Sequence, residues 1–356
     1  MYTQDEINLI VLSSFNLSFS AIRVLLNDFK STFPDFKNHE KLLIKMLSDG
    51  VYNRVKEKFN SFSYREKILC GLDKKGIKCV SLFSADYPET LKNIDDPPVL
   101  LYCKGDTSLL KSECFSIVGS RKTLPKSLSM TRQIAGELSE KFTIVSGIAE
   151  GADSTALEGA IEAGGKVISV LAHGLDHAYP PSNLNLLKKI EGNGLIISEY
   201  PPEVKPKPYY FPFRNRIIAG LSRGTLVVSA GERSGAKITA NFAVDFGREV
   251  FAFPYSVGIS SGEGCNELIK KGAVLVRNVL DIFDEFGLDF KRCEKTGLSE
   301  DESAVYEIIK NSDEAFLPEI ADRLNKSVAD ITTVITLLTI KGLIVSLGGN
   351  RYSAQK

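Results

Sequence analysis

The segment Phe115-Ser116-Ile117-Val118-Gly119-Ser120-Arg121 decides the fold of this 356-residue chain. A mostly apolar run of four residues, suited to a buried β-strand, is followed directly by a glycine, a hydroxyl and a guanidinium. A glycine at the end of a strand lets the backbone turn tightly, and the amide groups of such a turn can face an anion. The segment therefore predicts a strand of an α/β sheet, followed by a turn whose Arg121 and Lys122 bind phosphate.

A short apolar strand followed by a helix-length segment recurs from Cys114 to about Phe286. The predicted strands cover residues 116–118, 143–146, 166–171, 195–198, 226–229, 250–253 and 274–276. Strands that alternate with helices form a mostly parallel sheet covered on both faces, so the sequence predicts an α/β fold of the extended Rossmann-like, doubly wound type. Ligands of such sheets bind at the carboxyl ends of the strands, and we expect one composite site there.

The regions on either side of the sheet have other patterns. Residues 1–74 carry apolar residues at helical spacing, which predicts an N-terminal helical domain. Residues 75–290 are expected to form the Rossmann-like domain, which starts with a connecting piece and a short strand at 99–102. Residues 298–356 contain three predicted helices and a terminal hairpin, the pattern of a winged-helix domain. Its cations are few for a helix that enters a DNA groove, and a protein contact is favoured there over DNA binding.

A second candidate site lies in Phe211-Pro212-Phe213-Arg214-Asn215-Arg216, at the start of a predicted helix. Pro212 suits the first helical position. Helix residues two positions apart point in directions that differ by about 200°, so Arg214 and Arg216 cannot both hold one ligand. Of the two aromatic residues, Phe211 is the candidate for stacking on an unpaired base, whereas Phe213 fits the core better.

Two further turns at predicted strand ends complete the expected site. Ser146-Gly147 can supply hydroxyl and amide donors, although the residues after it also fit a simple helix start. Ser234-Gly235, with Lys237, resembles a phosphate cradle, but it lacks the GxxxxGK[ST] spacing and does not support nucleoside triphosphate hydrolysis. His173 and His177 have no nucleophile with a fitting partner, so we expect them to be loop residues.

The formal net charge is zero, which argues against a protein whose whole surface binds nucleic acid. Between Glu203 and Lys237, however, the chain has seven cations and two acids. The seven are Lys205, Lys207, Arg214, Arg216, Arg223, Arg233 and Lys237. A local patch can bind phosphates while the whole chain stays neutral.

Composition limits the class of protein further. No apolar run is long enough for a membrane helix, and the first residues are polar rather than signal-like, so a cytoplasmic location without a membrane partner is expected. The six cysteines include no CxxC pair, and with three histidines no zinc spacing can be assembled. We therefore expect no metal and no cofactor.

The order of these motifs resembles the DNA-processing family DprA, also called Smf. The segments that carry the resemblance include Val118-Gly119-Ser120-Arg121, Ser146-Gly147-Ile148-Ala149, Phe211-Pro212 through Leu221-Ser222, and Gly247-Arg248-Glu249-Val250. It covers about residues 75–285. It implies a cytoplasmic homodimer that binds incoming single-stranded DNA during natural transformation, protects it, and loads the RecA recombinase without catalytic turnover. The flanks also look like that family, with a sterile-alpha-motif-like N-terminal domain.

The resemblance also implies which residues bind DNA. These are the turn Gly119, Ser120 and Arg121, the residue Phe211, an upstream lysine for which Lys207 is the nearest candidate, and the cations of Arg214-Asn215-Arg216. The chain departs from the family pattern at Ala152, where an isoleucine is usual, at Leu157, where a histidine is usual, and at Ser229, where a glutamate is usual.

Two other functions stay open at this point. One is a Rossmann-like enzyme of the phosphoribohydrolase type that hydrolyses nucleotides, for which Glu232 is the one nearby carboxylate in the sequence. The other is an adaptor that works only through its terminal domains. The adaptor predicts no DNA binding by residues 105–290 alone.

Overall fold

The computed structural model describes residues 2–30, 33–232, 234–289, 298–312 and 314–354. Arg233, one of the predicted cations, lies outside these residues. The chain divides into two compact units, Met1–Phe290 and Lys291–Lys356. No helix among the described residues has the length and apolar character that a membrane crossing requires.

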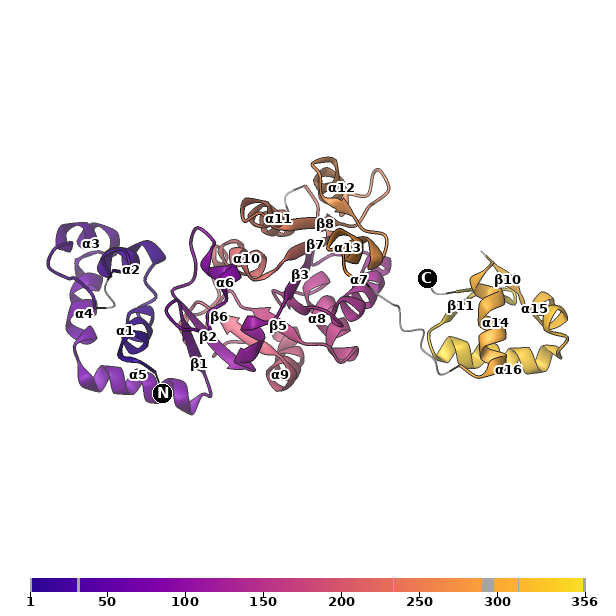
Figure 1. Cartoon of the computed structure of the whole chain (residues 1–356), viewed down its shortest axis with the longest axis horizontal. Helices are drawn as coiled ribbons and strands as arrows, with labels where there is room; N and C mark the ends of the chain where they lie inside the picture. The colour runs from indigo at the N-terminus through magenta and orange to yellow at the C-terminus, as the bar shows by residue number, and fades with distance from the viewer. Residues whose placement is uncertain (1, 31–32, 233, 290–297, 313, 355–356) are drawn as a thin grey trace. The chain divides into compact units, whose positions relative to one another are not determined.

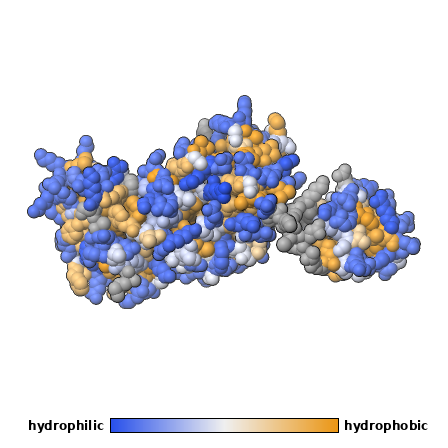
Figure 2. Space-filling model, in the orientation of Figure 1, coloured by the Kyte–Doolittle hydropathy of each residue, from blue (hydrophilic) through white to orange (hydrophobic). Residues whose placement is uncertain are grey.

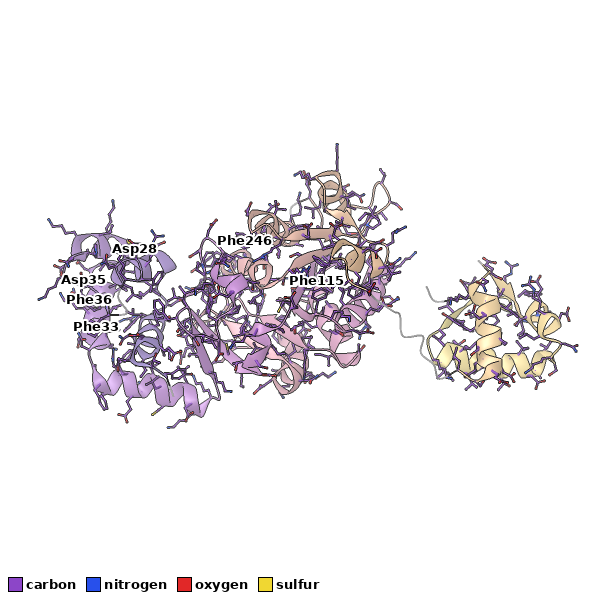
Figure 3. All side chains as sticks on the ribbon, in the orientation of Figure 1. Asp28, Phe33, Asp35, Phe36, Phe115 and Phe246 are labelled. Carbon is purple, nitrogen blue, oxygen red and sulfur yellow. The ribbon has the colours of Figure 1, made fainter. Side chains whose placement is uncertain are left out.

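Five helices begin the first unit, and they are α1 (Gln4–Ser13), α2 (Phe19–Leu25), α3 (Glu40–Leu47), α4 (Asp49–Phe59) and α5 (Phe62–Lys74). Thr3 starts α1 with a capping box, in which its hydroxyl accepts from the Glu6 amide and the Glu6 carboxylate accepts from the Thr3 amide. Buried apolar residues of α1, α2 and α4, with Phe36, form the core of this helical part (Figure 3). A second apolar cluster joins Ile10 and Leu72 to the first two strands of the sheet.

The sheet has nine strands in the order β1-β2-β6-β5-β4-β3-β7-β8-β9. They are β1 (Lys78–Ser81), β2 (Leu100–Gly105), β3 (Cys114–Gly119), β4 (Thr143–Ser146), β5 (Val167–Val170), β6 (Leu195–Ser198), β7 (Gly224–Ser229), β8 (Glu249–Ala252) and β9 (Val274–Leu275). The seven strands from β6 to β9 in this order pair in parallel, whereas β1 and β2 pair antiparallel at one edge. The predicted α/β fold with a mostly parallel sheet is confirmed, and β1 was not predicted.

Two helix layers cover the sheet, as Figure 1 shows. One layer contains α6 (Glu89–Lys92), α10 (Tyr210–Leu221), α11 (Gly235–Asp245) and α12 (Glu263–Lys270). The other contains α7 (Pro125–Leu138), α8 (Ala152–Glu162), α9 (Leu184–Asn193) and α13 (Leu280–Glu285). Phe115, labelled in Figure 3, belongs to the central strand β3. It is fully buried, and its ring contacts those of Phe142, Phe251 and Phe286. Strands buried on both faces explain why the strand segments are almost wholly apolar.

The second unit has its own apolar core. It contains α14 (Glu300–Lys310), α15 (Leu317–Leu324) and α16 (Val328–Ile340), with a three-stranded sheet in the order β10 (Ala315–Phe316), β12 (Arg351–Ala354), β11 (Ile344–Gly348). Residues 298–354 include nine acids and five cations, a net charge of −4. On the face that Figure 2 shows, hydrophilic residues surround smaller hydrophobic areas in both units.

Candidate nucleic-acid interface

The strand order reverses at β3, which lies between β4 and β7. The chain leaves β3 toward β4, β5 and β6, and it returns to β7 on the other side of β3. Loops at such a switch point diverge and leave a place for a ligand at the carboxyl ends of the strands. The turns after β3, β4 and β7 all lie at this edge.

The turn after β3 is packed closely against its neighbours. A Cβ on Gly119 would come within 2.6 Å of the Ala152 Cβ and of the Val228 Cγ2, so only glycine fits there. The Ser120 amide donates to the backbone oxygen of Ser229 at 3.0 Å and to its hydroxyl at 3.1 Å. The Lys122 amide donates to the Ser120 hydroxyl at 3.1 Å.

These bonds change the predicted role of the turn. Two of its amides have partners within the protein, so they are not free donors for an anion. The side chains of Arg121 and Lys122 are exposed and, within the described part of the chain, pair with no carboxylate. The turn therefore offers two exposed cations rather than a ring of amides.

The turn after β4 is strained and holds no free hydroxyl. Ser146 is fully buried and donates to the Ile117 oxygen at 2.6 Å, which corrects its predicted role as a ligand donor. Ile148 has a φ of +64°, which is rare for a β-branched residue. Asn183 holds this backbone by donating to the Ile148 oxygen at 2.9 Å. Strained backbone of this kind is concentrated at functional sites.

Arg214 lies beneath this turn and not at the surface. Its side chain is buried, and it donates to the backbone oxygens of Gly147, at 2.9 Å, and Val170. Asp153, also buried, is its opposite charge. Burial lowers the pKa of Arg214 to about 10 and raises the pKa of Asp153, although each charge opposes the shift of the other.

Arg216 is also buried, and a carboxylate already neutralises it. Its two terminal nitrogens donate to the two oxygens of Glu199 at 2.9 and 2.7 Å, and its Nε donates to the Asp96 backbone oxygen at 2.9 Å. Burial acts to lower the pKa of Arg216, but Glu199 outweighs it and the pKa is raised. The sequence predicts that at most one of the two arginines holds the ligand and that the other can anchor the helix. In the structure both side chains are buried and fix α10 to the sheet edge.

One of the two phenylalanines departs from its predicted position. Phe213, predicted for the core, is 41% exposed, because its ring packs on the Arg216 guanidinium at 3.8 Å rather than between helix and sheet. Phe211 is half-buried and packs against a small cluster of Ala172, Tyr200 and Tyr210. The ring of Tyr179 lies 5.6 Å from that of Phe211. Phe211 and Tyr179 thus form an aromatic pair at the edge of the sheet.

The helix α10 begins at Tyr210, two residues before the predicted start at Pro212. The residue before it, Tyr209, is 62% exposed and was not predicted as a site residue. Lys207 is exposed, and its Nζ lies 5.8 Å from the centre of the Tyr209 ring. The loop with these residues is tied to the helical part, since Lys75 pairs with Glu203 at 3.2 Å.

The fourth predicted segment starts α11. The Ser234 hydroxyl caps this helix by accepting from the Ala236 amide at 3.3 Å. Asn215 connects the segment to α10, as its Nδ2 donates to the Gly235 oxygen at 3.3 Å. Lys237 turns away to Glu267, whose pKa the side-chain hydrogen bonds of Lys237 and Lys271 lower to about 2. Lys237 is therefore a neutralised cation.

The residues that the sequence offers for catalysis are Glu232 and His173, and they lie in different environments. Glu232 is exposed in the loop after β7. His173 is buried, its Nδ1 lies 3.0 Å from the Gly174 oxygen, and burial lowers its pKa.

Known proteins are similar to this chain in sequence and in fold. Residues 78–287 match the family described as DNA recombination-mediator protein A. The chain is 40% identical to the DNA processing protein DprA of Bacillus subtilis over 62% of this chain and 74% of that one. It is 34% identical to the protein Smf of Escherichia coli over 84% of each chain.

Two solved structures resemble the fold. The DNA processing protein A of Streptococcus pneumoniae superposes with a TM-score of 0.64 at 32% identity and covers 82% of this chain and 100% of that one. A structure from Helicobacter pylori, described by its single-stranded DNA binding mode, gives a TM-score of 0.54 at 32% identity over 59% of this chain and 95% of that one. The chain therefore belongs to the DNA recombination-mediator protein A family, also called DprA or Smf.

Proposed function

We propose that this chain binds single-stranded DNA at the carboxyl edge of the sheet and acts as a recombination mediator. The observation that carries the proposal is the combination of groups at that edge. Exposed cations, Arg121, Lys122 and Lys207, occur with the aromatic pair Phe211 and Tyr179, while Asp153 is buried against Arg214. Cations bind the phosphates of a single strand, and aromatic rings stack on its unpaired bases.

The finer parts of the proposal rest on family membership. They are a cytoplasmic location, a homodimer, protection of incoming DNA in natural transformation, and loading of the RecA recombinase. We also propose that α1 to α5 form a sterile-alpha-motif-like domain and that residues 298–354 form a winged-helix domain. None of these roles requires turnover or a cofactor.

The test is an anisotropy titration against single- and double-stranded oligonucleotides of matched length at two salt concentrations. Arg121→Ala should weaken single-strand binding and make the slope of log K against log salt shallower by about 0.7. Phe211→Ala should weaken binding by about 1 to 3 kcal/mol and leave that slope nearly unchanged. Lys45→Ala, which removes an exposed cation of α3, is the matched control. Unchanged affinity in both site variants, with the fold intact, would refute the site.

The alternative enzymatic function has its own assay. Incubation with nucleoside monophosphates should release no base, and Glu232→Gln should change nothing. If the unaltered chain shows sustained turnover and Glu232→Gln abolishes it, the protein is an enzyme and the proposed mediator function is wrong.

A further inference from the structure

The start of α10 has two exposed aromatic rings on one face. Tyr209 is 62% exposed and Phe213 is 41% exposed. Tyr209 has right-handed helical backbone angles, φ −75° and ψ −11°, and precedes Phe213 by four residues. Residues at this spacing lie on the same face of a helix, about 6 Å apart along its axis. Two large exposed rings on one face of a helix are typical of a contact surface.

The Phe213 ring is held in place from beneath. The Arg216 guanidinium lies 3.8 Å from the ring centre, and that guanidinium is fixed in turn by Glu199 and by the Asp96 backbone. A ring that is already ordered loses little conformational freedom when a ligand stacks on it. Phe213 therefore has the properties of a preformed stacking surface.

The Tyr209 ring is also supported by buried residues. Its ring centre is 4.6 Å from that of Tyr210, and Tyr210 lies 4.1 Å from the ring of Tyr200. Tyr200 and Tyr210 are both buried. Tyr209 is thus the outermost member of a row of three tyrosines.

The charges beside this face favour an anionic ligand. Lys207 lies next to Tyr209 and, among the described residues, has no carboxylate partner. The two carboxylates nearest in sequence are already paired, Glu199 with Arg216 and Glu203 with Lys75. Flat exposed rings beside an unneutralised cation fit the bases and phosphates of a single strand.

We propose that Tyr209 and Phe213 form a second stacking platform, which holds unpaired bases beyond the base at Phe211, while Lys207 contacts the intervening phosphate. Phe211 and Phe213 are two residues apart, so their rings leave the helix in directions about 200° apart. A bound strand must therefore cross the amino-terminal end of α10. This inference rests on the proposed single-strand binding and names the path of the strand on that site.

The test compares alanine and conservative variants in the same titration. Tyr209→Ala and Phe213→Ala should each weaken single-strand binding roughly 5- to 150-fold, with the salt slope unchanged. Phe213→Leu keeps an apolar contact with Arg216 but no aromatic face, so it should not restore affinity. Phe62→Ala removes a ring that is 79% exposed on α5 and should bind like the unaltered chain.

A tryptophan introduced at position 213 can report binding directly, because the natural chain contains no tryptophan that would add its own fluorescence. Phe213→Trp should keep single-strand affinity, and its emission should change when an unlabelled oligonucleotide binds. Full affinity in Tyr209→Ala and Phe213→Ala, or recovery by Phe213→Leu, would overturn the platform. If Arg121→Ala and Phe211→Ala still weaken binding in that case, the proposed function stands, whereas absence of single-strand binding by the unaltered chain overturns both.

Discussion

Replacement of Arg214 by methionine separates a structural from a DNA-binding role for this residue. The change removes the donor to the Gly147 and Val170 oxygens and leaves Asp153 as a buried charge without its cation. Removal of one partner of a buried pair typically costs about 3 to 5 kcal/mol, a large part of the roughly 5 to 15 kcal/mol that stabilises a domain. We therefore expect Arg214→Met to lower the free energy of unfolding by about 3 to 5 kcal/mol.

Asp153 should account for part of this loss. In an Asp153→Asn background the uncharged amide needs no cation, so Arg214→Met should cost about 1 to 3 kcal/mol less than it does alone. Acidification should also reduce the loss. The pKa of Asp153 is already raised in the folded chain, and a raised folded pKa favours folding as pH falls, because the folded state binds the proton more tightly.

Urea denaturation followed by circular dichroism measures the stability, and hydrogen exchange of amides in β4 and β5 confirms that the sheet is the part affected. The salt slope of single-strand binding is the second reading. A loss of less than about 1 kcal/mol, together with a slope shallower by about 0.7, would show that Arg214 contacts a phosphate and would refute the structural role.

Three further predictions concern charges outside the centre of the site. Glu267→Gln should free Lys237 and increase single-strand affinity at low salt, while Lys271→Ala, which leaves the Lys237 pair in place, should not. The pKa of Glu267 is depressed to about 2, so the stabilising effect of its charge is present above pH 4.5 and is lost as pH falls toward 2. The urea midpoint of the unaltered chain should therefore fall more steeply with acid than that of Glu267→Gln. Parallel profiles of the two proteins would contradict the pairing of Glu267 with Lys237. A chain that ends before Leu298 should bind single strands with unchanged affinity and salt slope, because the removed residues 298–356 include nine acids and six cations, a net charge of −3. Weaker binding would assign a DNA contact to the removed residues.

The strands could be predicted because their signal is local. Each is a short run of apolar residues between turn residues, and burial on both faces requires little else. The strand β1 was missed because Lys78–Ser81 has one exposed residue and three buried ones, too short a pattern to separate from a loop. Its pairing with β2 depends on the sheet edge, which the sequence does not show.

The roles of the site residues could be predicted only in part, because burial of a cation depends on distant partners. Gly147 lies 67 residues before Arg214, and Val170 lies 44 residues before it. Glu199 belongs to the segment after β6, so nothing next to Arg216 in sequence indicates neutralisation. One signal was available: Tyr209 and Phe213 are four residues apart at the start of a helix, which predicts that both rings lie on the same face.

Burial of these charges decides how the site would hold DNA. Arg214 and Arg216 are buried, Lys237 is paired with Glu267, and Arg223 lies over the Phe286 ring. Of the cations predicted for the site or its local patch, those that the structure describes as exposed and that pair with no carboxylate among the described residues are Arg121, Lys122, Lys205 and Lys207. At about −0.7 per phosphate, four contacts give a salt slope near −3 per chain. Cation contacts with the phosphates weaken as the salt concentration rises, whereas stacking on aromatic rings does not depend on salt in this way. The rings of Phe211, Tyr209 and Phe213 should therefore determine the single-strand affinity that is left at high salt.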